Sequence, residues 1–347
     1  MRVLHCIAAL GAGGAERQLA MLTHQLPRFG WEVHVACLKG GVFEGELAPS
    51  TVIHRIPCRG EHDVRIPFRL AALIGRIRPL LVQTWLTQMD IHGGLAALSR
   101  RITWIAAERS SALAYSARPT NYVRAFLLPH ADAVVANSRG GLDVWKRSAA
   151  HQLHRIIPNS VSVVPLPDRV SNDVPLVVYA GRLSPEKRLP TLIQAMAEVR
   201  RQVPARAMIC GEGPMLTELQ AAARALSLNG AVTFAGHVSD VVSMLRRADV
   251  FVSLSRFEGF PNAVQEAMAC ETPLVVSDIP AHREFLDDSA ARLVAGEDAG
   301  TVAAAIVDCL RGRDAARARA AEALRRTAQW SPENVAAQYD ALYRELA

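Results

Sequence analysis

Short apolar runs alternate with longer amphipathic segments from one end of the chain to the other. The segments between the runs are long enough for crossover helices, so the alternation predicts parallel sheets with helices on both faces. In the first half, apolar runs of strand length lie at residues 2–8, 32–37, 51–56, 80–84, 102–106, 132–136 and 154–157.

The same pattern restarts after a proline-rich stretch. Residues 165–175 hold three prolines among polar turn formers, which is typical of an interdomain linker. A last helix is expected over 331–347, because Ser331 can cap it and Pro332 suits its first turn. Between the linker and this helix, strands are expected at 176–180, 206–210, 231–234, 249–253 and 273–276, and helices near 187–201, 213–226, 240–247 and 261–269.

The length of 347 residues fits two domains of about 150 to 200 residues each. We therefore expect two Rossmann-like, doubly wound α/β domains, over residues 1–165 and 172–330, with the helix over 331–347 packing back on the first. Sheets of this kind bind ligands beyond the carboxyl ends of their strands. Two such domains facing each other would form a cleft for the chemistry.

Composition narrows the class of protein. No run of 18 apolar residues occurs, so no membrane span is expected, and the segment Met1–Ile7 reads as a buried strand rather than a signal peptide. We accordingly expect a cytoplasmic location. The six cysteines include no Cys-x-x-Cys pair, which favours buried, reduced thiols over a zinc site.

Charge is distributed unevenly. Residues 1–165 carry a net charge of +9 and residues 166–347 a net charge of −3. A basic half can face nucleic acid, anionic lipid or an anionic acceptor, but the interleaved aromatic and basic residues typical of nucleic-acid binding are missing. We therefore expect no nucleic acid among its partners.

Residues 65–76 read as a basic amphipathic helix. Helical spacing puts Arg65, Arg69 and Arg76 on one face, with Phe68, Ala72 and Leu73 elsewhere. An ordinary solvated helix would show the same face. We nevertheless predict that this half docks on an anionic membrane surface.

A glycine-rich loop follows the first predicted strand. A dinucleotide fingerprint would need glycine where Glu16 stands, and an acid at the end of the second strand, where the chain reads Cys37-Leu38-Lys39. Binding of NAD is therefore not favoured. Gly13 and Gly14 still allow a ligand close to the backbone at a helix start, although a tight turn would use them equally.

Two basic residues follow the first strand of the second half. Arg182 and Lys187 lie in the loop and at the expected helix start, where they can converge on one anion. A guanidinium fork and a compact ammonium suit a diphosphate. A solvated basic helix start is the alternative.

Two glutamates follow a later strand. Glu258 is expected in the loop before a helix, with Pro261 in its first turn and the amides of Asn262 and Ala263 favouring a negative group. Glu266 lies further inside this helix, where ribose hydroxyls would be suitable partners. A glutamate on the helix surface is the alternative.

Smaller features complete this predicted ligand site. Gly211 ends one strand, and Val238 follows another strand at a place where a flat base can rest. No Asp-x-Asp pair is present to hold a divalent ion under a diphosphate, so we expect neither a metal nor another cofactor.

Together these motifs resemble glycosyltransferase family 4, over nearly the whole chain. The segments that carry the resemblance are 13–16 (Gly-Gly-Ala-Glu), 136–138 (Ala-Asn-Ser), 157–160 (Ile-Pro-Asn-Ser), 181–187 (Gly-Arg followed by Lys), 211–214 (Gly-Glu-Gly-Pro), and 258–260 (Glu-Gly-Phe) with Glu266.

The resemblance implies a GT-B fold and a retaining transfer of sugar without an established covalent nucleophile. It implies that Arg182 and Lys187 hold the donor diphosphate, that Glu266 binds the ribose, and that Glu258 sits by the transferred sugar. Gly14, next to Gly13, would border the diphosphate from the first domain. The segment Gly259-Phe260-Pro261 is counted with the donor site.

One position departs from the family pattern. Many relatives place a histidine after the strand that matches residues 103–106, where this chain reads Ala107-Glu108-Arg109. His92, Glu108 and Arg109 are therefore the candidates for contacting the sugar from the first domain, and a purely structural His92 remains an alternative.

The expected function is transfer of a sugar from a nucleotide-diphosphate donor, without a metal, to a lipid-linked or saccharide acceptor in cell-surface polysaccharide synthesis. The enzyme would work at the inner face of the membrane. Two alternatives stay open: a sugar-nucleotide epimerase on a similar fold, and a non-catalytic module that binds nucleotide sugars.

Overall fold

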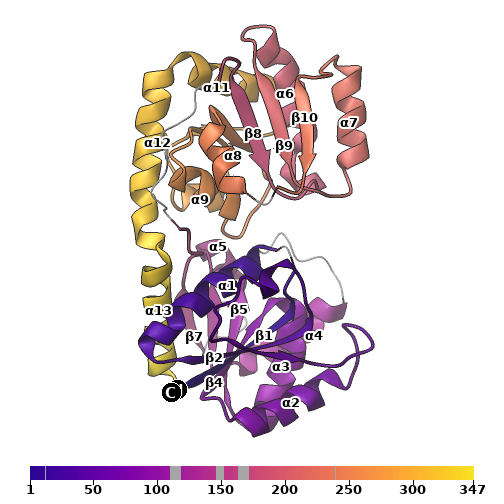
Figure 1. Ribbon diagram of the computed structural model, residues 1–347, viewed down its shortest axis with the longest axis vertical. Coiled ribbons are helices and arrows are strands. Elements are labelled where there is room, and N and C mark those ends of the chain that lie inside the picture. The colour runs from indigo at the N-terminus through magenta and orange to yellow at the C-terminus, as the bar shows by residue number, and fades with distance from the viewer. Residues whose placement is uncertain (12, 110–118, 146–151, 163–171, 239) are drawn as a thin grey trace. The chain divides into compact units, whose positions relative to one another are not determined.

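A computed structural model describes residues 1–11, 13–109, 119–145, 152–162, 172–238 and 240–347. The chain divides into two compact units, Met1–Ser160 with Trp330–Ala347, and Val161–Gln329 (Figure 1). Each unit has its own sheet and its own hydrophobic core. Residues 165–171, which make up most of the expected linker, lie outside the described residues.

Seven parallel strands form the sheet of the first unit, in the order β3-β2-β1-β4-β5-β6-β7. Each of the seven apolar runs becomes one of these strands, which confirms that part of the sequence prediction. Their bounds are β1 (Arg2–Ala9), β2 (Glu32–Lys39), β3 (Val52–Arg55), β4 (Leu81–Trp85), β5 (Thr103–Glu108), β6 (Ala133–Ala136) and β7 (Leu153–Ile156).

Helices cover both faces of this sheet. On one face α1 (Gly14–Gln25) packs with α13 (Pro332–Glu345) over a shared core, so the end of the chain completes the first unit (Figure 1). The other face is covered by α2 (Ile66–Ile77), α3 (Leu86–Arg100) and α4 (Pro119–Leu127). Helix α5 (Arg139–Trp145) follows β6.

Helix α13 begins where the sequence predicts. Pro332 is its first residue, and the Ser331 hydroxyl accepts a hydrogen bond of 3.2 Å from the Asn334 amide. Such a cap satisfies one of the amides that a helix start leaves without a partner.

Six parallel strands form the sheet of the second unit, in the order β10-β9-β8-β11-β12-β13. The last of them was not predicted, because a run of three residues beside an alanine-rich stretch gives no strand pattern. Their bounds are β8 (Leu176–Ala180), β9 (Arg206–Cys210), β10 (Val232–Gly236), β11 (Val250–Ser253), β12 (Leu274–Ser277) and β13 (Arg292–Val294).

Helices also cover this second sheet. The main core lies between the sheet and the helices α6 (Leu189–Arg200), α7 (Leu216–Ala225) and α11 (Ala299–Arg311). Helices α8 (Val241–Arg247) and α9 (Asn262–Ala269) pack together beside the central strands, and α12 (Arg313–Thr327) contacts α9 and α11 (Figure 1). The shorter helical turns are η1 (Leu26–Phe29), η2 (Val42–Glu44), η4 (Leu128–His130), η5 (Pro185–Lys187), η6 (Ala328–Trp330) and α10 (Pro280–Arg283).

Strand order reverses once in each sheet, between β1 and β4 in the first and between β8 and β11 in the second. Segments that leave the carboxyl ends of two strands at such a point diverge to opposite faces of the sheet, and the gap between them is where doubly wound folds bind ligands. In the second unit these two segments carry Arg182, Lys187 and Glu258.

Candidate functional site

The segments that follow β8 and β11 are joined directly. The Arg256 amide donates a hydrogen bond of 2.8 Å to the Glu186 carbonyl, which ties the loop after β11 to the turn η5. Lys187 Nζ forms a close ion pair with Glu258 Oε1. The fold therefore brings together two residues that lie 71 positions apart in the sequence.

This ion pair is largely shielded from water. The side chains of Lys187 and Glu258 are 20% and 16% exposed. The hydroxyl of Ser255 donates a second hydrogen bond, of 2.6 Å, to the same carboxylate oxygen. Because interactions between charges strengthen as water is excluded, Glu258 is held firmly in one orientation.

Arg182 differs from Lys187 in being exposed. Its carbonyl accepts a hydrogen bond of 2.9 Å from the Tyr179 hydroxyl, so the backbone is fixed while the guanidinium reaches solvent. Burial raises the pKa of Tyr179, and the nearby charges of Glu258 and Glu186 add to this effect.

Glu186 is the other acid in this turn. Burial alone would raise its pKa, but a hydrogen bond from Ser184 and the charges of Lys187 and Arg182 outweigh burial and lower it. The turn thus holds an ionised carboxylate among basic groups, and the arginine remains available to a ligand.

Glycines allow the loops at this edge of the sheet to touch. A Cβ on Gly211 would lie 1.9 Å from the Gly181 carbonyl oxygen, and one on Gly213 would lie 2.3 Å from that of Leu183. Gly211 also has a φ of +129°, which favours glycine. Gly211 therefore lies beside the predicted phosphate loop, and backbone packing by itself requires glycine there.

Hydrogen bonds continue this contact along the sheet edge. The Leu183 amide donates to the Glu212 carbonyl at 2.8 Å, and the Gly211 amide donates to the Gly236 carbonyl. Val238 lies two residues beyond Gly236 and is half-buried. The ends of β8, β9 and β10 therefore form one connected rim.

Helix α9 begins one residue later than predicted, because Pro261 is its N-cap and Asn262 its first residue. The amides of Asn262 and Ala263 lie in its first turn, after the segment Gly259-Phe260. The ring of Phe260 packs against that of Phe285, with centroids 5.0 Å apart.

Glu266 is 9% exposed, and the residues that follow it on α9 are fully buried. The alternative of a glutamate on the helix surface is therefore wrong. A carboxylate that is this well covered requires polar partners, because the charged form is costly to bury.

Gly13 and Gly14 belong to the first unit. Gly13 has an extended backbone and forms the N-cap of α1, and Gly14 is the first residue of that helix. A Cβ at Gly13 would meet the carboxylate of Glu16, whose side chain folds back over the helix start. Glu16, which stands where a dinucleotide fingerprint has glycine, thus occupies space beside the glycine-rich loop.

The three candidates for contacting the sugar from the first domain, His92, Glu108 and Arg109, have different surroundings. Glu108 is 1% exposed and accepts a hydrogen bond of 3.0 Å from Arg124, which also donates to Asp90 at 2.7 Å. Burial is the largest influence on Asp90 and raises its pKa. Glu108 is therefore part of a buried ion-pair cluster.

His92 lies on α3 and is nearly buried. Its Nε2 atom lies 2.8 Å from the Glu61 carbonyl oxygen and 3.1 Å from Gln88 Nε2. These contacts tie α3 to the loop before α2, which is the structural role that the sequence left open for this residue.

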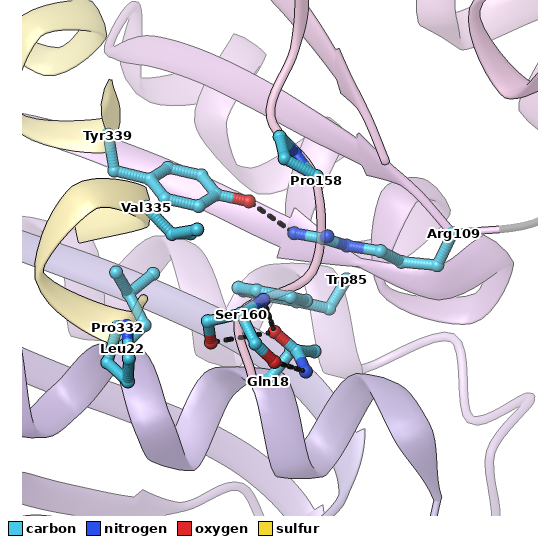
Figure 2. Close-up of a pocket in the computed structure, with 9 residues that line it drawn as sticks. All are labelled: Gln18, Leu22, Trp85, Arg109, Pro158, Ser160, Pro332, Val335 and Tyr339. Atoms are coloured by element: carbon cyan, nitrogen blue, oxygen red, sulfur yellow. Dashed lines mark hydrogen bonds between the residues drawn. The ribbon is translucent and has the colours of Figure 1, made fainter. Parts of the chain in front are cut away.

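Arg109 lines a small pocket within the first unit (Figure 2). Its guanidinium lies over the Trp85 ring, 4.4 Å from the centroid, and donates to Asn159 Oδ1 at 3.1 Å and to the Tyr339 hydroxyl. Figure 2 shows Tyr339 reaching the arginine from α13. The whole lining comprises Gln18, Leu22, Trp85, Arg109, Pro158, Ser160, Pro332, Val335 and Tyr339.

Gln18 and Ser160 bind each other across the lower part of this pocket. Gln18 Nε2 donates to the Ser160 carbonyl at 2.9 Å, and Gln18 Oε1 accepts from the Ser160 amide at 2.6 Å (Figure 2). The Ile-Pro-Asn-Ser segment is thus anchored between α1 and α13. The tyrosine on α13 gave no signal in the sequence, because it lies more than 200 residues from Arg109.

All six cysteines are free thiols, and all except Cys58 are buried. Within the described part of the chain, no group of three or more His, Cys, Asp or Glu side chains is placed to hold a metal ion. No helix of the described residues is long and apolar enough to cross a membrane.

Comparison with known proteins agrees with this architecture. Two family models match consecutive parts of the chain: "Glycosyltransferase Family 4" over residues 12–164, and "Glycosyl transferases group 1" over residues 168–327. HepE from Anabaena, solved with UDP and glucose, superposes with a TM-score of 0.83 and 18% identity, over 99% of each chain.

The relatives that align at the level of sequence include two glycosyltransferases of stated substrates. An N-acetylgalactosaminyltransferase from Campylobacter jejuni, which acts on a diphospho-undecaprenol substrate, is 25% identical over 294 residues, or 78% of this chain and 79% of the relative. A GDP-mannose-dependent phosphatidylinositol dimannoside mannosyltransferase from Mycobacterium tuberculosis is 38% identical over 115 residues, or 32% of this chain and 29% of the relative.

Two tandem sheets of this order, with their basic and acidic residues at the strand ends, define a glycosyltransferase of the GT-B fold. The chain belongs to glycosyltransferase family 4.

Proposed function

We propose that this protein transfers a sugar, with retention of anomeric configuration, from a nucleotide-diphosphate donor to an acceptor hydroxyl. The observation that carries the proposal is the contact between the β8 and β11 segments, which brings Lys187 and Glu258 together beside the exposed Arg182. One cationic surface for a diphosphate and one carboxylate for a sugar thus lie side by side.

The donor would occupy the carboxyl edge of the second sheet. Arg182 and Lys187 bind the diphosphate, assisted by the first amides of α9. Glu266 binds the ribose, and the base rests near Val238.

Charge stabilisation would lower the barrier to transfer. As the bond between the anomeric carbon and the diphosphate breaks, negative charge builds up on the leaving group, and the two cations stabilise it. The acceptor oxygen attacks from the same face, and its proton passes to an oxygen of the departing diphosphate. Glu258 orients the sugar, and no metal is needed in this scheme.

The donor nucleotide is left open by the relatives, since one of them is solved with UDP and another uses GDP-mannose. Thermal-shift measurements with UDP-, GDP- and ADP-sugars test donor binding directly. A donor present at 100 times its Kd adds about 2.7 kcal/mol to the stability of the folded protein. If no sugar nucleotide raises the melting temperature, the proposed donor site is wrong.

We further propose a lipid-linked or saccharide acceptor used in cell-surface polysaccharide synthesis, at the inner face of the membrane. The Campylobacter relative, which acts on a diphospho-undecaprenol substrate, supports this choice. Product analysis by NMR reports the linkage and the anomeric configuration. Inversion at the anomeric carbon would contradict the retaining mechanism, and an epimerised sugar nucleotide would indicate the epimerase instead.

Membrane docking is the third part of this proposal. Helices α2, α3 and α4 pack side by side and expose Phe68, Tyr122 and Phe126, which are 76%, 67% and 74% exposed. Large exposed aromatic residues near basic ones suit an interfacial surface on an anionic membrane.

The structure changes which groups would carry this docking. Helix α2 buries Ile66, Leu70, Leu73, Ile74 and Ile77, so Leu73 faces the core, whereas Phe68 and Ala72 share the solvent side with the arginines. That buried stripe consists of apolar residues three and four positions apart. The sequence prediction grouped Phe68 and Ala72 with Leu73, away from the arginines, and this grouping was wrong.

Not every arginine of this helix is available for docking. Arg65 binds Asp63 through both ends of its guanidinium, and Arg69 donates to the Pro57 carbonyl. Arg76 makes no such contact with the described residues. The exposed aromatic residues therefore carry more of the proposed docking than the net charge suggests.

A further inference from the structure

A buried histidine, His282, lies close enough to the Lys187–Glu258 pair for both charges to affect its pKa. His282 lies in the short helix α10 after β12, and its side chain is fully buried. Its Nδ1 atom lies 2.7 Å from the Ser277 carbonyl oxygen. Because a carbonyl oxygen can only accept, Nδ1 must carry the proton, and in the neutral ring Nε2 is then an acceptor.

The surroundings keep this ring neutral. Burial has the largest effect on the His282 pKa and lowers it, and the charge of Lys187 acts in the same direction. The Ser277 carbonyl and the charges of Glu258 and Asp278 oppose this effect without reversing it. Nε2 is buried and has no hydrogen-bond partner among the described residues.

Hydrogen bonds lead from this ring to the candidate site. The Ser277 hydroxyl donates to the Ser255 carbonyl at 2.7 Å, and the Ser255 hydroxyl donates to Glu258 Oε1 at 2.6 Å. Both serines are buried. Each hydrogen bond positions the next group, and the last of them reaches the carboxylate that pairs with Lys187.

These links lie where the regular sheet ends. Backbone pairing of β11 with β12 stops at Ser253 and Val276, and the Ser277–Ser255 bond continues the connection one step further. Gly296 allows close packing there, since a Cβ on it would lie 3.1 Å from Ser277 Cβ. Beyond the paired residues, a side-chain hydrogen bond therefore holds the ends of β11 and β12 together in place of backbone pairing.

We propose that His282 is a positioning residue for Glu258: its Nδ1–H fixes the end of β12, so that Ser277 holds Ser255 and the Ser255 hydroxyl orients the carboxylate. The consequence for catalysis rests on the proposed sugar transfer. Among the described residues, the His282 ring forms hydrogen bonds only with Ser277, so its effect on Glu258 passes through the two serines.

Replacement by asparagine separates this role from simple packing. The amide nitrogen of Asn lies close to the place of Nδ1 and can donate to the Ser277 carbonyl, whereas alanine cannot. His282→Ala should lower kcat about 10- to 100-fold, as misplaced catalytic groups do, while His282→Asn should stay within about threefold of the unsubstituted enzyme.

The probes are the sugar nucleotide that gives the largest thermal shift and its free nucleoside diphosphate. The diphosphate alone should bind every variant at least as tightly as the unsubstituted protein, because Lys187 and Glu266 are unchanged and a displaced Glu258 competes less for the ammonium. Thr272→Val is the matched control, because it removes another buried hydrogen bond, from the Thr272 hydroxyl to the Leu245 carbonyl at 2.8 Å, just before β12. The proposal is overturned if kcat falls as far in His282→Asn as in His282→Ala, or if His282→Ala keeps its full kcat. It is also overturned if the control Thr272→Val loses as much activity as His282→Ala.

Two readouts need no activity. ¹⁵N NMR of the imidazole should show the Nδ1–H tautomer, and hydrogen exchange across residues 254–261 should speed up in His282→Ala but not in His282→Asn or Thr272→Val. An Nε2–H tautomer or unchanged exchange would refute the positioning role. If hydrogen exchange changes as expected but the protein transfers no sugar, the positioning role stands and only the proposed function is contradicted.

Discussion

Lys187 and Glu258 neutralise each other in the protein without ligand. A donor diphosphate must therefore compete with the Glu258 carboxylate for the same ammonium. Arg182 carries no such partner among the described residues and is exposed, so it can make the first contact with an anion. The two cations thus have different roles, although the sequence alone presents them as an equivalent pair.

We predict that Arg182→Ala and Lys187→Ala each lower kcat about 100- to 1000-fold, which corresponds to about 2.7 to 4 kcal/mol of lost transition-state stabilisation. Steady-state kinetics with the donor identified by thermal shift measures this. Circular dichroism checks the fold, because Lys187→Ala also leaves a partly buried carboxylate without its cation.

Arg224→Ala is the matched control, because Arg224 is an exposed arginine on α7 of the same unit. This variant should keep its full rate. Near-normal rates in both site variants would show that the diphosphate binds elsewhere.

We predict that Gly211→Ala destabilises the second unit strongly. The added Cβ would overlap the Gly181 carbonyl oxygen, and the positive φ adds about 1 to 3 kcal/mol of strain. Gly230→Ala is the control, since Gly230 has a φ of +73° but open space around it. The midpoint of thermal unfolding should fall further for Gly211→Ala, and equal losses would mean that the loop contact contributes nothing.

Elements of the first unit show how packing selects among similar residues. Helix α13 supplies Tyr339 to Arg109, and α4 supplies Arg124 to Glu108 and Asp90. The neighbouring residues Glu108 and Arg109 thus contact different helices, Glu108 the helix α4 and Arg109 the helix α13. Arg109 remains the candidate that lines a pocket.

We predict that vesicle binding depends on the exposed aromatic residues of α2 and α4. Phe68→Ser and Phe126→Ser should each weaken co-sedimentation with anionic vesicles, and added salt should weaken it further, because each nearby basic side chain contributes about 1 kcal/mol that ions screen. Leu226→Ser, at an exposed position in the second unit, should bind as the unsubstituted protein does. Equal binding to neutral and anionic vesicles would rule out the electrostatic contribution.

At the scale of the whole molecule, the two halves of the sequence carry different net charges, +9 over residues 1–165 and −3 over residues 166–347. The excess of positive charge lies in the half proposed to meet an anionic surface. Arg182 and Lys187 stand out because they lie in the more acidic half, at the switch point of its sheet.

We predict full transferase activity in excess EDTA. In the proposed mechanism, the positive charge that balances the diphosphate comes from Arg182, Lys187 and the first amides of α9, so chelation should leave kcat unchanged. The assay compares rates before and after chelation, with added Mg²⁺ or Mn²⁺ as the control. Loss of activity that either ion restores would show that a metal takes part.

The sequence by itself determined the fold class, because period and length of apolar runs report which faces are buried. Seven strands of the first unit and five of the second lie where these runs predict. It also identified Lys187 and Glu258 as candidates, since each follows a strand at its carboxyl end. It missed β13, whose three residues are too few to show a period.

Only the tertiary structure decided which of these residues meet. Side-chain contacts such as those of Lys187 with Glu258, Tyr339 with Arg109 and Ser255 with Ser277 join segments far apart in the chain. Local patterns report burial and capping within a few residues, whereas such contacts depend on strand order and on where each loop leaves the sheet. For that reason His282, which lies in an unremarkable stretch of sequence, is seen to support Glu258 only once β11 and β12 are paired.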